Sequence, residues 1–420
     1  MYFKGMRKHI HNYGSTIRWR SDLEKGALVS NFERRRWIRA NGDEDWNIYW
    51  ASVHTVKHIF NPDHGYRLND RQLINHFPNH YELTRKDLMV KNIKRYAKDL
   101  AKEGLNVPLF VPTTYLLPAD YSLFVEEFRR RPFTWIMKPT SKARGIGIFI
   151  VNKLSQIKKW ANNKWASSST RDNYVISRYI DNPLLVGGKK FDLRLYALVT
   201  SYRPLRVYMY REGFCRFTTQ RYTNDLSNLD NLYVHLTNVS IQTKADEYNE
   251  KHGGKWTLRN FRLYIEGIYG TQRANQVFED IERIILLSLK SVQSIIINDK
   301  HCFECYGYDI IVDNDLKCWL VEVNASPSLS ATTHNDRIMK HKLINDIFRV
   351  VTPNDDHLDV KDRSPNNYKA ETRVGQFELM YDEVGSVSGR FADNFSFQNE
   401  HEGNSDRRNL LTGISNAKWR

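Results

Sequence analysis

The sequence predicts a mixed α/β or α+β fold. Short runs of β-type residues alternate with amphipathic helices between Thr134 and Val351, a pattern typical of that class. The 420 residues, 41% hydrophobic and 13% aromatic, suffice for two or three packed subdomains around a sizeable core. We therefore expect a small N-terminal α/β lobe (residues 1–82), a central lobe (83–175), a C-terminal lobe (176–352) and a mostly disordered tail (353–420).

The N-terminal lobe is weakly specified, because residues up to about Pro78 mix aromatic and basic clusters with polar turns. The helix that follows has a stronger signal, and Thr84 is placed to cap it. Apolar residues recur behind this cap at helical spacing, while lysines and arginines ring the other faces. The apolar positions are Met89, Ile93, Tyr96 and Leu100.

Seven runs of β-type residues are expected to form strands of the other two lobes: 135–138, 146–151, 174–180, 191–200, 207–210, 308–312 and 319–323. The clearest helix spans about Gln272–Ile297, and its buried stripe is Val277, Ile281, Ile284, Ile285 and Leu289. Beyond about Pro353 the composition turns polar and loses periodicity. Within this tail only Val374–Met380 is expected to dock as a short segment.

Composition narrows the class of protein. No stretch approaches the roughly eighteen apolar residues that a bilayer span needs, so we expect a soluble, non-secreted protein without membrane contact. Four cysteines are too few for a disulfide framework in a chain of this size. The pair Cys302-X-X-Cys305, with His301 and Cys318 nearby, lacks complete zinc spacing and precedes a strand. Thiols are therefore expected.

The charge balance points to an acidic partner. The chain has 63 basic and 48 acidic residues, for a net charge of +15, and such a field attracts polyanions. Nucleic acid, anionic lipid and acidic protein tails all fit that charge. No RNP, KH, zinc-finger or helix-turn-helix signature accompanies it, so nucleic-acid binding is not expected.

The segment YGYDIIVDNDLKCWLVEVNASP, residues 306–327, predicts an antiparallel hairpin that carries a metal site. A turn centred between Asp315 and Leu316 places Asp309 opposite Glu322, and Asn324 follows on the same face. Like charges opposite each other destabilise a half-buried ladder. A divalent cation removes that conflict, and oxygen-only ligands suit Mg²⁺. A solvated hairpin edge with scattered acids is the alternative.

Three further segments carry weaker signals. Lys138 ends an apolar strand before a loop with Arg144 and Gly145, and such cations and glycines suit phosphate oxygens, although an ordinary turn fits too. In KKFDLRLYALV, alternation places Lys190, Asp192 and Arg194 on one face, as the floor of a cleft or as a solvated face. The run VHLTNVSIQ adds Thr237 and Asn238, which capping or strand pairing would also explain.

Taken together, these segments resemble the tubulin tyrosine ligase-like family of ATP-grasp amino-acid ligases, in the same order from Trp37 to Pro353. The matching motifs are NHYELTRKDLMVKNIKRY, TWIMKP, GGKKFDLRLYALV, YVHLTNVSIQ, HCFECYGYDI and WLVEVNASPSL. Their combination is similar to the glutamylase branch, especially its shortest members. The resemblance implies an ATP-grasp-type fold, with the lid and phosphate-binding strand in the central lobe and the metal-binding hairpin in the C-terminal lobe.

The resemblance also implies roles for particular residues. Asp309, Glu322 and Asn324 correspond to the Mg²⁺ ligands, which the hairpin argument reaches independently. ATP contacts are implied for Lys91, Lys138, Arg144, Gly145, Ser177, Arg178, Tyr179, Ile180, Lys190, Asp192, Thr237 and Asn238. Arg216 and Lys255 correspond to groups that hold the incoming glutamate, Arg194 belongs to the same charged floor, and Arg144 also faces substrate. The lid departs from relatives, which more often have Gln and Lys in place of Arg144 and Ile146.

The implied reaction is ATP-dependent ligation of free glutamate to γ-carboxylates in the acidic C-terminal tails of tubulin, through an acylphosphate. Ligation of glycine or tyrosine, or a catalytically silent tubulin-binding scaffold, are the alternatives. The expected location is the cytoplasm and cytoskeleton, including the axoneme and basal body of cilia or flagella. The tail after Pro353 has mixed charge, so we expect companion subunits to bring the chain to microtubules, with Val374–Met380 as the candidate docking segment.

Overall fold

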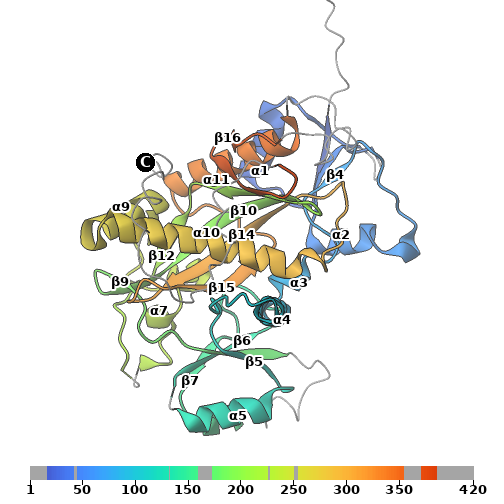
Figure 1. Ribbon diagram of the computed structural model, residues 1–420. Helices are drawn as coiled ribbons and strands as arrows, with labels where there is room; N and C mark the ends of the chain where they lie inside the picture. Colours follow the sequence, from blue (N-terminus) through green and yellow to red (C-terminus); the bar gives the residue numbers. More distant parts are fainter. Residues whose placement is uncertain are drawn as a thin grey trace, which may run out of the picture.

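The structure is a computed structural model that describes residues 17–41, 45–131, 133–158, 173–225, 228–249, 254–353 and 370–385. These residues form one nine-stranded and two four-stranded sheets, with helices packed against them (Figure 1). The expected mixed fold of helices and sheets is confirmed. Among the described residues, no helix is long and apolar enough to cross a membrane.

The N-terminal sheet is parallel, with the order β2-β1-β3-β4. Phe32 anchors its helical cover, because its ring stacks on Trp19 and on Phe348 of the helix α11. The elements of this region are β1 (Arg18–Ser21), α1 (Gly26–Arg34), β2 (Ile38–Arg39), β3 (Ile48–Trp50), α2 (Val53–Ile59), the 3-10 helix η1 (Pro62–His64), β4 (Leu73–Ile74) and α3 (Tyr81–Thr84), with α11 at His334–Val351.

The large sheet is built around the 14-residue strand β10. Its alternation separates two cores: Leu193, Leu195 and Ala197 lie in the cluster that contains α10, whereas Tyr196 and Leu198 lie in the cluster that contains α11. The elements are β9 (Leu185–Val186), β10 (Lys189–Tyr202), β11 (Leu205–Tyr210), β12 (Phe214–Phe217), β13 (Lys255–Thr257), α9 (Leu258–Tyr269), α10 (Thr271–Gln293), β14 (Glu304–Val312) and β15 (Cys318–Asn324).

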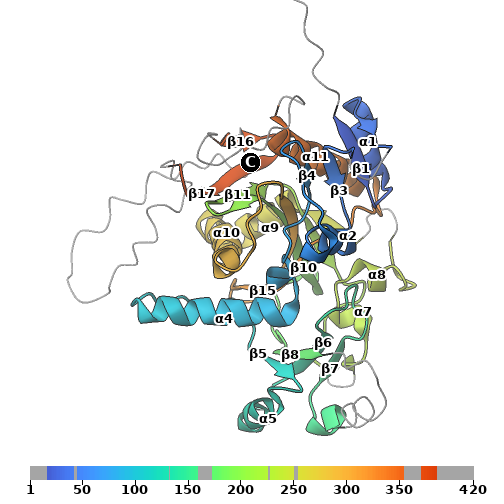
Figure 2. The same ribbon diagram turned by 90° about the vertical axis from the view of Figure 1, so that its right-hand side faces the viewer.

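A smaller lobe lies below this sheet in Figure 2, and α4 lies between the two. Its antiparallel sheet has the order β5-β8-β6-β7, and Phe124 of α5 packs edge-on against Trp135 of β6. The elements are α4 (Lys86–Lys102), β5 (Thr114–Leu117), α5 (Tyr121–Arg130), β6 (Trp135–Pro139), β7 (Phe149–Val151), β8 (Tyr174–Arg178), α7 (Leu232–His235) and α8 (Val239–Gln242).

Both predicted helices are present. Helix α10 buries the whole predicted stripe, and α4 buries Met89 and Ile93. The predicted cap of α4 was wrong, because Arg85 occupies the cap position without a side-chain hydrogen bond. Thr84 instead ends α3, where its hydroxyl donates to the carbonyl of His80 at 3.2 Å.

Each of the seven predicted runs contains a strand. The run 146–151 becomes a strand only at Phe149, because the preceding loop is a tight turn. Arg144, Gly145 and Gly147 all have positive φ there, at 62°, 78° and 74°, which is incompatible with an extended strand. All four cysteines are buried and free, as expected, and burial raises the pKa of each thiol.

The described part of the C-terminal tail completes the large sheet. Strands β16 (Arg373–Val374) and β17 (Phe377–Asp382) contain the segment that was expected to dock, and β17 pairs with β11. Phe377 and Met380 are buried, and Arg206 forms a buried ion pair with Asp382 at 3.0 Å. Of the predicted disordered tail, residues 354–369 and 386–420 lie outside the described residues.

Candidate active site

The hairpin has the predicted register. Asp309 of β14 pairs with Glu322 of β15, and a bulge lies between Asp309 and Ile310. Asp313 stabilises the turn, because its Oδ1 accepts hydrogen bonds from the backbone N–H groups of Asp315 and Lys317 at 3.0 and 2.9 Å. Leu316 in the turn has φ +65°. Two carboxylates therefore face the same cleft from adjacent strands.

Asn324 lies on the same edge of the hairpin as the two carboxylates. Its Nδ2 donates to Glu322 Oε1 and to the carbonyl of Gly307, both at 3.3 Å. These bonds leave its Oδ1 available as a third oxygen ligand. Gly307 is required opposite it, because a Cβ there would lie 2.9 Å from Pro327.

Two arginines hold Asp309. Arg194 donates from Nε at 2.5 Å and from Nη2 at 3.1 Å, and Arg216 donates from Nη2 at 2.8 Å. Arg216 also forms a bidentate pair with Asp192, its neighbour across β10 and β12. Burial raises the pKa of Asp309, but the charges of Arg194 and Arg216 outweigh this and hold that pKa well below its usual range. Asp309 is thus held ionised and in a fixed orientation.

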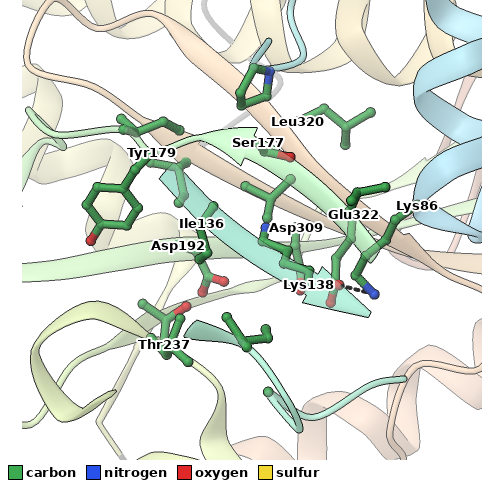
Figure 3. Close-up of a pocket in the computed structure, with 18 of the residues that line it drawn as sticks. Lys86, Ile136, Lys138, Ser177, Tyr179, Asp192, Thr237, Asp309, Leu320 and Glu322 are labelled. Atoms are coloured by element: carbon green, nitrogen blue, oxygen red, sulfur yellow. Dashed lines mark ion pairs between the residues drawn. The ribbon is translucent and has the colours of Figure 1, made fainter. Parts of the chain in front are cut away.

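A cleft that is partly open to solvent lies between the hairpin and the smaller lobe (Figure 3). Thirteen of the residues singled out from the sequence line it: Lys138, Arg144, Gly145, Ser177, Arg178, Tyr179, Ile180, Lys190, Asp192, Thr237, Asn238, Asp309 and Glu322. Its apolar walls include Met89, Ile136, Val175 and Leu320. An apolar slot with cations and carboxylates at one end suits a nucleotide.

Buried ammonium groups face this cleft. Burial lowers the pKa of Lys138 to about 8, with Glu322 opposing the shift and Lys86 adding to it. Burial and then the charge of Lys138 lower the pKa of Lys190 to about 7. Without an anion to pair with, these ammonium groups are costly. Their placement favours a ligand that brings several negative charges.

Hydrogen bonds to two neighbours fix the orientation of the Lys190 side chain. Its Nζ donates to Tyr179 Oη at 2.8 Å and to the His235 carbonyl at 3.1 Å. Tyr179 Oη in turn lies 3.0 Å from Nδ1 of His235, and burial followed by the charge of Lys190 lowers the pKa of His235 to about 4. His235 was not among the predicted site residues, and its place in the VHLTN motif was the available signal.

Lys86 is a second residue that the sequence analysis missed. Its Nζ lies 3.2 Å from Glu322 Oε2 and donates to the carbonyl of Lys142 at 3.1 Å. Lys91, the lysine singled out on the same helix, is exposed and is not among the cleft-lining residues. Lys86, Met89 and Val90 share one face of α4 and line the cleft, whereas Lys91 lies off that face.

The loop that carries Arg144 and Gly145, which the resemblance identified as the lid, packs on α8. Ser240 Oγ donates to the carbonyl of Arg144 at 2.9 Å, and a Cβ at Gly145 would collide with the side chain of Ile241. The glycine and its φ of 78° thus permit the close approach that encloses the cleft near Asn238.

A second cationic cluster lies at the start of α11. Lys255 Nζ donates to Asp336 Oδ2 at 2.6 Å and to Thr332 Oγ1 at 2.9 Å. Lys340 lies 2.9 Å from Asp336 Oδ1 and donates to the carbonyl of Ser330 at 2.5 Å. Two ammonium groups share one buried carboxylate, so the cluster has an excess positive charge. Four predicted site residues are not among those that line the cleft: Lys255, Arg194, Arg216 and Asn324.

The oxygen ligands of the hairpin fit a hard cation. Asp309, Glu322 and Asn324 supply two carboxylates and one amide oxygen, a set that suits Mg²⁺ shared with phosphates. Among the described residues, no group of three or more His, Cys, Asp or Glu side chains is placed to hold a metal. A metal here would therefore take part of its coordination from a bound ligand or water.

Comparison with known proteins supports one family. The tubulin-tyrosine ligase family matches residues 66–360. A probable alpha-tubulin polyglutamylase, Ttll1 of Tetrahymena thermophila, is 54% identical over 388 residues, which cover 88% of this chain and 93% of that protein. The probable tubulin polyglutamylase TTLL9 of Rattus norvegicus is 42% identical, over 89% of this chain and 85% of its own length. The tubulin polyglutamylase TTLL5 of Mus musculus is 37% identical over 73% of this chain and 23% of its own length. This chain therefore belongs to the tubulin-tyrosine ligase family and is an ATP-dependent ligase.

Proposed function

We propose that the chain is a tubulin polyglutamylase, which ligates glutamate to γ-carboxylates in the acidic C-terminal tails of tubulin. The observation that carries the proposal is the facing pair Asp309 and Glu322, set beside the lysines of one cleft. The names of the similar proteins support the choice of tubulin as acceptor and glutamate as the added amino acid.

Asp309, Glu322 and Asn324 would hold Mg²⁺, which screens phosphate charge when bound. Lys138, Lys190 and the lid at Arg144 bind and orient the phosphates of ATP, and Met89, Ile136 and Leu320 pack on the base. Thr237 and Asn238 offer a hydroxyl and an amide beside them. Catalysis then depends on positioning and on electrostatic stabilisation of the transferring phosphoryl group.

The incoming amino acid belongs at the second cationic cluster. Arg216 is buried between Asp192 and Asp309, so it orients the floor of the site. Lys255 and Lys340 have one carboxylate between them, and this excess charge suits an additional carboxylate such as that of glutamate. The net charge of +15 favours encounter with acidic tails.

The deciding experiment is mass spectrometry of tubulin tails after incubation with ATP, Mg²⁺ and each of glutamate, glycine and tyrosine. Mass increments of glutamate alone support the proposal. Increments of glycine or tyrosine would reassign the amino acid, and ATP turnover without any increment would exclude a ligase that acts on tubulin. Tight tubulin binding without ATP turnover would identify a silent scaffold.

We further infer a place on the cytoskeleton, in cilia and at basal bodies, with companion subunits that raise the local concentration of the chain at microtubules. The isolated chain and complexes from ciliated cells should be compared at equal active-site concentration in a salt series. Full glutamylation of microtubules by the isolated chain at physiological salt would rule out the companion requirement.

A further inference from the structure

A hydroxyl, an imidazole and a carboxylate line up beside the hairpin. Ser326 Oγ lies 3.3 Å from Nε2 of His76, and Nδ1 of His76 lies 2.8 Å from Oε1 of Glu304. Glu304 and His76 are buried, whereas Ser326 is exposed. These three residues come from β14, from the segment after β4 and from the loop after β15.

The hydrogen bonds determine which nitrogen of His76 accepts. Glu304 Oε2 accepts from the N–H of Phe77 and from the hydroxyl of Tyr306, both at 3.0 Å. Because these partners are donors, Glu304 is the acceptor and His76 donates from Nδ1. Nε2 is then free to accept the Ser326 proton, an arrangement known from hydroxyl–imidazole–carboxylate catalysis. A further titratable side chain beside His76 is His80, and the centroids of the two rings lie 5.3 Å apart.

The loop that carries Ser326 connects the hairpin to the second cationic cluster. Its loop begins at Asn324, on the hairpin, and reaches Ser330, whose carbonyl receives Lys340 of the cationic cluster. Pro327 of this loop packs against Gly307, which in turn adjoins Arg194. This loop therefore joins the part of the site that would hold the incoming amino acid to the part that would hold the acylphosphate.

We propose that Ser326, His76 and Glu304 form the proton relay that activates the amine of the incoming amino acid, which rests on the proposed ligase function. The free amino acid is an ammonium ion at neutral pH, and it must lose one proton before it attacks. That proton passes to Ser326 Oγ as the hydroxyl proton moves to His76 Nε2, and Glu304 stabilises the imidazolium. The C–N bond then forms, the C–O bond to phosphate breaks, the second amine proton leaves with the phosphate, and the imidazolium returns its proton to solvent.

Hydroxylamine separates this relay from a structural role. It is a far weaker base than an amino acid and is neutral at pH 7, so it attacks an acylphosphate without a relay. Ser326→Ala and His76→Gln should lower glutamate ligation to tubulin on the order of 100-fold at pH 7. Formation of the tail hydroxamate from ATP, tubulin and hydroxylamine should stay within about twofold of wild type. Ser328→Ala and His80→Gln are the matched controls and should keep both products.

Equal loss of ligation and hydroxamate in Ser326→Ala would show that the network only supports the fold, and the relay would be wrong. Retention of both products in Ser326→Ala would refute it as well. Because Ser326 is exposed, this variant should fold even if His76→Gln does not. If wild type forms hydroxamate but ligates an amino acid other than glutamate, the proposed amino acid is wrong, and the same comparison with that amino acid tests the relay.

Discussion

Replacing Lys190 with methionine should stabilise the fold and remove ATP binding. Burial holds the pKa of the Lys190 ammonium near 7 rather than 10.5. One pKa unit corresponds to about 1.4 kcal/mol, so folding a protein with this lysine costs roughly 4 kcal/mol at pH 7. The variant also leaves the His235 carbonyl without its partner at 3.1 Å, which costs about 1–2 kcal/mol. The expected gain in the free energy of unfolding is about 2–3 kcal/mol.

The pH dependence of this gain has a definite sign. Between pH 7 and 10.5 the unfolded chain keeps the Lys190 proton that the folded chain has released, so wild-type stability rises with pH across that window. The advantage of Lys190→Met is therefore largest at pH 7 and below, and disappears towards pH 10.5. Bound ATP should reverse the order by pairing with the ammonium group.

Urea denaturation at several pH values, with and without a non-hydrolysable ATP analogue, measures both effects. Lys189→Met is the matched control, because Lys189 is half-buried and is not among the cleft-lining residues. This control should change neither quantity. If Lys190→Met is no more stable than Lys189→Met at pH 7, the Lys190 ammonium carries no burial cost and the reasoning fails.

Three further predictions concern Glu322 of the hairpin, Arg216 beneath Asp309, and Phe377 of the C-terminal tail. Glu322→Gln should abolish product with little change in stability, because Glu322 is half-buried and its ion pair is with Lys86. Wild-type turnover in this variant would exclude Glu322 as a metal ligand. Arg216→Ala should raise the KM for glutamate more than that for ATP and cost about 3–5 kcal/mol, since it removes the bidentate partner of buried Asp192 and one of the two arginines that hold Asp309; an effect confined to the KM for ATP would move it to the nucleotide side. Phe377→Ala should cost about 3–5 kcal/mol in thermal or urea unfolding, and an unchanged stability would show that β17 is dispensable.

Local signals in the sequence were sufficient for the hairpin. Its register follows from a turn and from alternation within 20 residues, and Asp309 faces Glu322 as predicted. Interactions between distant segments had no such signal. Arg194 and Asp309 are 115 residues apart, and His76 and Glu304 are 228 apart, so no spacing rule relates them. The hydrogen bonds that Arg194 and Arg216 donate to Asp309 become apparent only from the fold.

Helical periodicity explains the miss on α4. The resemblance to a family motif singled out Lys91, but the predicted apolar positions already indicated which side of the helix is buried. Residues 86, 89 and 90 share one face of a helix, since they are spaced by three and four. Met89 and Val90 line the cleft, and so does Lys86. Periodicity was the better guide to the cleft-facing lysine, because it constrains direction as well as sequence position.

The pairing of β17 bears on the proposal that companion subunits dock through Val374–Met380. Companion subunits were predicted to dock through Val374–Met380. In the structure, Phe377 and Glu378 of this segment pair with β11 on one side and with β16 on the other. Phe377 and Met380 are buried in the two cores of the large sheet, and Asp346 accepts the backbone N–H of Gln376 at 2.9 Å. A partner that added a strand beside Phe377 and Glu378 would have to displace β11 or β16. A companion that leaves the sheet intact would therefore have to use the outer edge of β16, half-buried side chains such as Leu379, or another surface. Substitutions of the buried side chains of β17 should lower stability whether or not a companion binds there.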